Sequence, residues 1–488
     1  MKENKKINLV KSLDENIDTI SRLFPIGKSF DIITREMKFG DTRVYWMGIN
    51  GMFDNEVMQL ALSNLQNPVF TGDDVISCLE NYIAAKTSIA QLSLTDDVDT
   101  VLRSVVSGPV AILVDGFDKA IIIDLRKYPV RSIEEPENEK VLRGSKDGFV
   151  ETMLFNTNLI RRRIRNNSLT FELKTVGNES KTDVAMAYVG SIASEELVND
   201  VRNAIDGIDV DSLTLGSKSL EELLVKKRWY NPMPSIQITE RPDVACSYLE
   251  EGYVLVIVDN TPSVIILPGN IFQFSQSPED YYRNPLIGNS FRFLRNLSAL
   301  ISLYILPVFL LVAGYIPELS EKINLIEERG MGAFKLFLFI LFAELGLDML
   351  EYAASHSPGN LITPVSVVGG IVLGEMAVNM EWFTEEVLFY AAITLLTTFV
   401  INSHEFSDAL RIYRVMLLIL TGLLGIPGII LGSILVIVSV VTTPSFGKGG
   451  YLWPLFPFEW ESLKALIYRK HVLSAQPDRR KKSKTPYR

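Results

Sequence analysis

The stretch LSALISLYILPVFLLVAGYI, residues 297–316, contains no charged side chain. A membrane-spanning helix needs about 20 mostly apolar residues, so this stretch is long enough to cross a bilayer by itself. Four more apolar stretches follow it, at residues 333–350, 361–378, 387–401 and 412–441. The sequence therefore predicts an α-helical, multi-pass transmembrane domain over residues 290–443.

The last of these stretches is too long for one ordinary span, and Gly425-Ile426-Pro427-Gly428 interrupts it. Glycine and proline end or kink helices, so we expect a hairpin there with arms of about 15 residues each. Arms of that length fit either two thin spans or a re-entrant pair. We therefore interpret the domain as four full spans plus this hairpin or re-entrant pair.

Basic residues flank the apolar region on both sides. Arg283, Arg292 and Arg295 precede it, and the tail at residues 444–488 is strongly basic. Because basic residues mark the cytoplasmic side, both the N-terminal region and the tail are expected in the cytoplasm. The three arginines, with the neighbouring tyrosines 281 and 282, suit the headgroup zone of that leaflet.

Carboxylates occur inside these apolar stretches, at Glu344, Asp348, Glu351 and Glu375. The first three stand at i, i+4 and i+7 and so share one helix face. Repeated around a symmetric oligomer, that face would form acidic rings that attract cations, with Glu375 as another ring. The alternative is that Asp348 and Glu351 are hydrated at the inner end, and that Glu344 is protonated or pairs with a basic residue.

The residues before the first span read as a soluble α/β region with a weak internal repeat. GPVAILVDG (108–116) followed by AIII (120–123) matches GYVLVIVDN (252–260) followed by VIIL (264–267). Each copy predicts a strand, a tight turn and a second strand after a helix. We expect a flexible lead-in at 1–20, one subdomain at 21–133 and another at 141–285. The repeat is interpreted as structural, with a ligand cleft between the copies as the alternative.

Composition argues against several kinds of site. The chain has a net charge of −10, two cysteines and three histidines. We therefore expect no disulfide framework, no metal site and no nucleic-acid binding. Gly27-Lys28-Ser29 lacks the glycine that a phosphate-binding loop needs five residues earlier, where Arg22 stands. No nucleophile–base pairing is visible, so we expect neither a cofactor nor an enzyme.

Three consecutive arginines, Arg161, Arg162 and Arg163, form a basic cluster. Such a cluster could dock an anion, a lipid headgroup or an acidic partner surface. The alternative is a solvated helix face with local ion pairs, each of which contributes little to stability.

Several ordered motifs carry a family resemblance. They are RGSKDGFVE…LIRRRI (143–164), TERPD (239–243), EG…VDNTP (251–262), EDYY (279–282), VSVVGG (365–370), NSHEFS (402–407) and SFG (445–447). Together they resemble the A-subunit family of bacterial spore germinant receptors, the GerA family. This family usually has Pro-Arg-Glu at 145–147 and Gln at 375, where this chain has Ser-Lys-Asp and Glu. These departures indicate a divergent paralogue within the family.

The resemblance implies a multi-pass protein of the spore inner membrane that contacts membrane lipid and acts in nutrient-triggered germination. It implies a transporter-like B subunit and a lipoprotein C subunit, or another small membrane protein, as partners. It also implies a homo-oligomer that conducts monovalent cations. Motif residues are then candidates for a partner or subunit interface: Arg143, Gly144, Gly148, Phe149, Glu151, Arg161, Arg162, Arg163, Glu279, Asp280, Tyr281 and Tyr282.

Two other functions stay open on the sequence. A membrane-anchored scaffold could recruit germination partners through the soluble region, although intramembrane carboxylates argue against a passive anchor. A secondary transporter would explain the broken helix at 425–428, but no second broken helix stands in a matching position.

Overall fold

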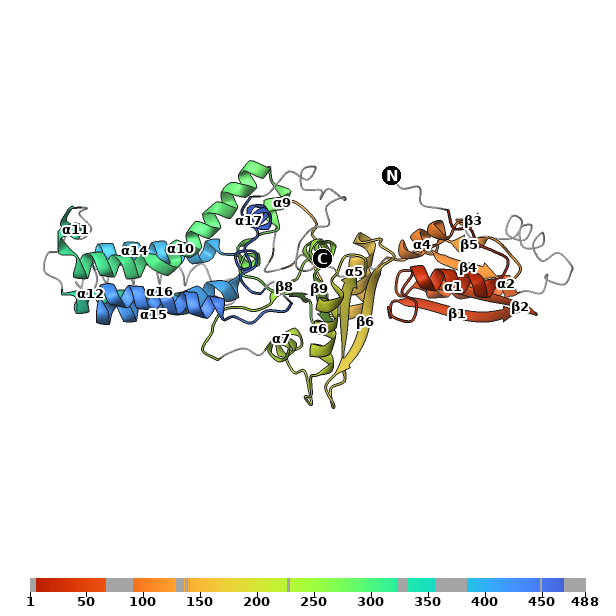
Figure 1. Cartoon of the computed structure of the whole chain (residues 1–488), viewed down its shortest axis with the longest axis horizontal. Coiled ribbons are helices and arrows are strands. Elements are labelled where there is room, and N and C mark those ends of the chain that lie inside the picture. The colour runs from red at the N-terminus through yellow and green to blue at the C-terminus, as the bar shows by residue number, and fades with distance from the viewer. Residues whose placement is uncertain are drawn as a thin grey trace.

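The computed structural model describes residues 6–66, 91–128, 136, 139, 141–225, 229–322, 332–355, 384–447 and 450–468. These residues form three parts in a row along the long axis of the molecule (Figure 1). A first sheet, a second sheet and a helical bundle follow one another in chain order.

The first part is an antiparallel sheet with strand order β1-β2-β4-β5-β3. Its strands are β1 (Ile32–Phe39), β2 (Thr42–Ile49), β3 (Leu92–Thr95), β4 (Val110–Val114) and β5 (Ala120–Ile123). Helices α1 (Leu13–Leu23) and α4 (Val98–Val106) bury apolar residues on one face, and α2 (Asn55–Gln66) covers the other. Every side chain of β4 is buried because both faces are covered, which explains its unbroken apolar sequence.

The second part repeats this arrangement in the order β6-β7-β9-β10-β8. Its strands are β6 (Leu169–Val176), β7 (Thr182–Val189), β8 (Gln237–Thr239), β9 (Val254–Val258) and β10 (Val264–Leu267). Its helices are α5 (Met153–Arg163), α6 (Glu195–Asp206), α7 (Ser217–Leu224) and α8 (Pro242–Glu251). The expected pair of α/β units is therefore confirmed as two antiparallel sheets.

The two units match down to single hydrogen bonds. Asn16 donates to the carbonyl of Val10 at 2.6 Å and accepts from its amide at 2.9 Å; Asn156 makes the same pair with Val150 at 2.5 and 2.8 Å. Asp115 and Asp259 each accept from the first amide of the unit's first helix, at 3.1 and 3.0 Å. The repeat thus begins at α1 and α5, well before the strands that revealed it in the sequence.

This finding corrects the flexible lead-in expected at residues 1–20, for the part from residue 6 onward that the structure describes. Leu13 and Ile20 on α1 have no exposed surface and belong to the core of the first unit, together with Leu9. Charged residues between these positions hide the helix in the sequence, because they occupy its solvent-facing side.

The third part is helical, as expected. Its described helices are α9 (Glu279–Tyr282), α10 (Pro285–Tyr315), α11 (Pro317–Lys322), α12 (Ala333–Ser355), α14 (Glu385–Val400), α15 (His404–Leu424), α16 (Ile426–Val441) and α17 (Trp460–Ile467). Within the described ranges, α10 alone has both the length and the apolar composition of a membrane span, and α16 is a shorter apolar helix. The expected span at 361–378, with Glu375, lies outside the described residues.

The expected hairpin near residue 425 is a pair of full helices. Gly425 is the single residue between α15 and α16, and its φ of +65° suits glycine. α15 begins at His404, so the first arm has 21 residues and is longer than expected. Glycines let the helices approach closely: a Cβ on Gly432 would lie 2.6 Å from Leu417, and one on Gly422 would lie 2.6 Å from Phe337.

Candidate functional site at the junction of the second sheet and α10

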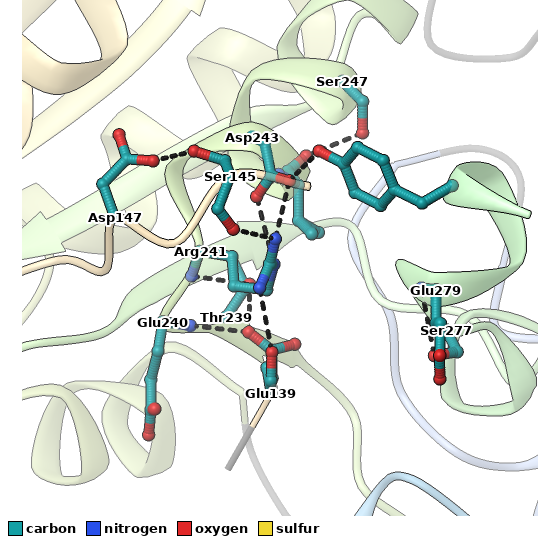
Figure 2. A network of polar contacts seen from close by, with 12 residues as sticks. Glu139, Ser145, Asp147, Thr239, Glu240, Arg241, Asp243, Ser247, Ser277 and Glu279 are labelled. Carbon is teal, nitrogen blue, oxygen red and sulfur yellow. Dashed lines mark hydrogen bonds and ion pairs between the residues drawn. The ribbon is translucent and has the colours of Figure 1, made fainter. Parts of the chain in front are cut away.

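Three sequence motifs meet around one arginine where the second sheet joins the helical bundle. Arg241 is fully buried and forms a two-pronged ion pair with Asp243 at 3.1 and 2.9 Å (Figure 2). It also donates to the carbonyls of Glu139 and Ser145 at 3.0 and 2.9 Å. A guanidinium carries several donors in a rigid plane, so one side chain can hold three chain segments together.

Tyr282 of α9 connects this network to the helices. Its hydroxyl donates to Asp243 at 2.5 Å. Burial raises the pKa of the Asp243 carboxyl, but the hydrogen bonds from Arg241 and Tyr282 outweigh burial and bring the pKa below its usual range. Asp243 is therefore held as an anion between the sheet and α9.

Gly144 packs directly against the tyrosine ring. Its φ is +126°, and a Cβ at this position would lie 2.6 Å from the ring of Tyr282. Both the backbone conformation and the close approach therefore require glycine at this position.

Asp280 of α9 pairs with two arginines in the first turns of α10. It forms ion pairs with Arg295 and, at 3.6 Å, with Arg292; both arginines are buried. Arg295 also donates to the carbonyl of Ser275 at 2.9 Å, and Arg292 donates to that of Leu466 on α17 at 2.7 Å. Arg292 and Arg295 are therefore held by partners within the protein and not by lipid headgroups.

A cavity of about 490 Å³ opens beside this junction. It lies between the edge strand β8, the segment before α9 and the turn from α14 to α15, and its lining includes Gln237, Glu279 and His404. Across the described ranges, no group of three or more His, Cys, Asp or Glu side chains is placed to hold a metal ion.

The arginine cluster on α5 joins the two sheets. Arg161 is fully buried and pairs with Asp31 of the first unit at 2.8 Å, while donating to the carbonyl of Leu169 at 3.1 Å. Ser29 donates to Asp31 at 2.5 Å and accepts from the amide of Phe171 at 2.9 Å, which closes the link between the units. The solvated-face interpretation is therefore wrong for Arg161.

The other two arginines of the cluster contact different neighbours. Arg162 lies over the ring of Tyr128, with 5.0 Å from its guanidinium carbon to the ring centre. Arg163 pairs with Asp147 at 2.5 Å. The three consecutive arginines thus contact three different segments and do not form one anion-binding patch.

Inside the helical bundle, Glu344 of α12 pairs with Arg414 of α15 at 2.6 Å, and both side chains are buried. Arg414 also donates to the carbonyl and hydroxyl of Ser302 on α10, at 3.1 and 2.9 Å. This pair therefore connects three helices at one level, and the alternative that Glu344 has a basic partner holds.

The other two carboxylates on this face of α12 lie around Arg411. Asp348 is 3.5 Å and Glu351 is 3.8 Å from its guanidinium, and Asp408 approaches it at 3.4 Å. Unlike the buried Glu344, these three carboxylates are partly or largely exposed. Three carboxylates therefore share one guanidinium at this end of the bundle.

The family model described as "Bacillus/Clostridium GerA spore germination protein" matches residues 19–482. The chain belongs to the GerA family. It is 34% identical to "Stage V sporulation protein AF" of Bacillus subtilis (strain 168), with 96% of this chain and 94% of that protein covered. It is 29% identical to "Spore germination protein KA" of the same organism, with coverage of 94% and 84%.

A solved structure is also similar to this GerA-family chain. It is the N-terminal domain of the A subunit of the Bacillus megaterium spore germinant receptor GerK3. The two are 26% identical and align with a TM-score of 0.41 over 54% of this chain and 97% of that one.

Apart from the three arginines of α5, the motif residues predicted as an interface include buried and exposed ones in the GerA-family fold. Gly144, Asp280 and Tyr282 belong to the junction network, and Phe149 is buried, with its amide donating to Glu240 at 2.8 Å. Arg143, Glu151 and Tyr281 are exposed, and Glu279 pairs with Arg283 at 3.1 Å. The exposed group stays a prediction for a partner surface.

Sequence reasoning did not include Arg241, Asp31 or Arg414 among the site residues. Arg241 lies in the TERPD motif, but nothing in that motif shows that the arginine is buried. Arg414 could have been found, because an arginine inside an apolar stretch requires a partner as much as Glu344 does.

Replacing Gly144 by alanine should loosen the junction. We expect a cost of about 1–3 kcal/mol from the backbone conformation alone, with displacement of Tyr282 in addition. Hydrogen exchange of the full-length protein in detergent should then speed up across residues 279–295. Gly116→Ala is the matched control, because its φ is +84° but no atom lies within 4 Å of the added carbon. Equal effects of the two variants on residues 279–295 would contradict the packing role of Gly144.

Proposed function

We propose that this chain is a multi-pass subunit of a germination complex in the spore inner membrane, and that it oligomerises to release monovalent cations. Membership of the GerA family supports the role in germination. The soluble units and the tail would lie in the cytoplasm. The observation that carries the cation proposal is the set of charged side chains within the helical bundle, because such charges face water or each other in a membrane.

The carboxylates would have different roles in this proposal. Glu344 is neutralised by Arg414, so it holds the helices together and does not line a pathway. Asp348, Glu351 and Asp408 outnumber Arg411 and retain access to solvent, which suits them to attract cations at the cytoplasmic end. An oligomer would repeat this acidic cluster around its axis.

Partners would attach to the exposed surfaces of the soluble units and helices. Membership of the GerA family and similarity to named spore germination proteins support a germination complex that contains other subunits here. We propose a transporter-like B subunit and a lipoprotein C subunit, or another small membrane protein, in that role. We propose no enzymatic activity and no cofactor.

Cation flux through the purified protein in liposomes, alone and with co-expressed partners, tests this proposal. We expect flux of monovalent cations in at least one combination. A second candidate is a membrane-anchored scaffold, favoured by the rigid connection of the sheets to α10 through Arg241 and Asp280. Absence of flux in every combination would contradict the cation proposal and favour the scaffold.

A further inference from the structure

Helix α10 is longer than a bilayer requires. Its 31 residues extend about 46 Å, whereas the hydrocarbon core is about 30 Å thick. The uncharged stretch at 297–316 accounts for the core, so the first three turns of α10 remain on the cytoplasmic side of it. These turns must lie in the interfacial zone or in water.

The first turns of α10 have two different faces. Gly288, Arg292 and Arg295 face the protein and are buried against Asp280 and α17. The opposite face exposes large apolar side chains, with Leu286 at 73% and Phe293 at 69%. A surface in water would normally carry polar groups at these positions, and this stripe continues into the exposed Leu297 and Leu300 of the span.

A second set of exposed apolar side chains lies at the start of α17 and directly before it in the chain. Phe456 is 78%, Phe458 68% and Trp460 62% exposed, and the rings of Phe458 and Trp460 stack at 6.4 Å. α17 starts at Trp460 and contacts α10 through the hydrogen bond from Arg292 to Leu466, and Figure 1 shows it next to the start of α10. Aromatic side chains are enriched where a membrane meets water.

Charge identifies the surface that would cover these residues. The chain continues from α17 into residues 469–488, which contain eight Lys and Arg residues and one Asp. A basic segment that follows exposed aromatic and aliphatic side chains in the sequence suits an anionic leaflet, because apolar side chains enter the acyl boundary and basic ones are attracted to anionic headgroups.

We propose that Leu286, Phe293, Phe456, Phe458 and Trp460 form a collar that inserts into the interfacial zone of an anionic cytoplasmic leaflet. The collar rests on the proposed membrane-spanning topology and adds a specific lipid contact to it. Because Arg292 and Arg295 tie the same turns to Asp280, the collar would also fix the height of the second sheet above the membrane.

Nitroxide labels on the full-length protein test the collar in vesicles of phosphatidylglycerol and phosphatidylcholine. Phe458→Cys reports the collar, Leu142→Cys is a soluble-region control with similar exposure, and Ile437→Cys on α16 is a reference inside the proposed membrane domain. Cys78→Ser removes one native thiol. The other, Cys246, is buried, and burial raises the pKa of its thiol to about 12, so it remains unlabelled.

At Phe458→Cys we expect several-fold more frequent collisions with oxygen, which dissolves in lipid, than with a water-soluble nickel complex. Leu142→Cys should show the reverse. Water-like behaviour at Phe458→Cys, or protection from both reagents by a second copy or another protein, would overturn the collar while Ile437→Cys still reports lipid. If Ile437→Cys also behaves as if in water, the membrane topology itself fails.

In vesicles of phosphatidylcholine alone, the preference for oxygen at Phe458→Cys should weaken, and an unchanged preference would overturn the requirement for anionic lipid.

Discussion

Replacing Glu344 by glutamine should destabilise the helical bundle by about 3–5 kcal/mol, because it leaves the buried guanidinium of Arg414 without a counter-charge. Arg414 would keep only its hydrogen bonds to Ser302. Those bonds cannot balance a full positive charge in an apolar surrounding. The loss should appear as a lower midpoint of thermal unfolding for the full-length protein in detergent.

Two further variants separate the ion pair from the general effect of a substitution. Glu351→Gln makes the same chemical change on the same helix, but Glu351 is partly exposed and 3.8 Å from Arg411, so it should cost at most about 1 kcal/mol. The double variant Glu344→Leu with Arg414→Met removes both charges and should recover much of the lost stability. Equal midpoints for Glu344→Gln and Glu351→Gln would show that the pair does not hold the bundle.

Replacing Arg161 by methionine should separate the two sheets. The change leaves Asp31 as a buried carboxylate without its arginine partner. Breaking a buried pair by removing one partner costs about 3–5 kcal/mol. We expect much faster hydrogen exchange at residues 28–31 and 169–171, where the two units exchange backbone and side-chain hydrogen bonds.

The matched control for this change is Arg163→Met on the same helix. Arg163 pairs with Asp147 at a partly exposed site, and such pairs contribute about 0–1 kcal/mol. Exchange at the sheet junction should therefore stay near that of the unaltered protein. Similar exchange in both variants would mean that apolar packing around Phe171, and not the ion pair, holds the sheets together.

Local patterns made much of the fold predictable. Strands β4 and β9 are buried on both faces, so their apolar sequence revealed them, and the turns after them carry Asp115 and Asp259. Asp97 at the N-terminus of α4 accepts a hydrogen bond from Thr100 at 3.0 Å, as a helix cap should. In each case the signal and the structure lie within a few neighbouring residues.

Partners of charged residues were not predictable in the same way. Arg161 and Asp31 lie 130 positions apart, and Glu344 and Arg414 lie 70 apart. An arginine near a membrane has the same sequence signature whether it contacts headgroups or a buried carboxylate. For that reason the sequence favours lipid headgroups as partners of Arg292 and Arg295, whereas the structure pairs both with Asp280.

Cation flux in liposomes containing the double variant Asp348→Asn with Glu351→Gln is the most direct test of the account. This variant removes two carboxylates near Arg411 and leaves the buried pair of Glu344 and Arg414 intact. We predict that flux falls several-fold relative to the unaltered protein at equal reconstituted amounts. A double variant of Glu385 and Glu386, both to Gln, should keep its flux, because these residues start α14 at the opposite end of the bundle. Unchanged flux after loss of Asp348 and Glu351 would contradict an acidic cation pathway at this site.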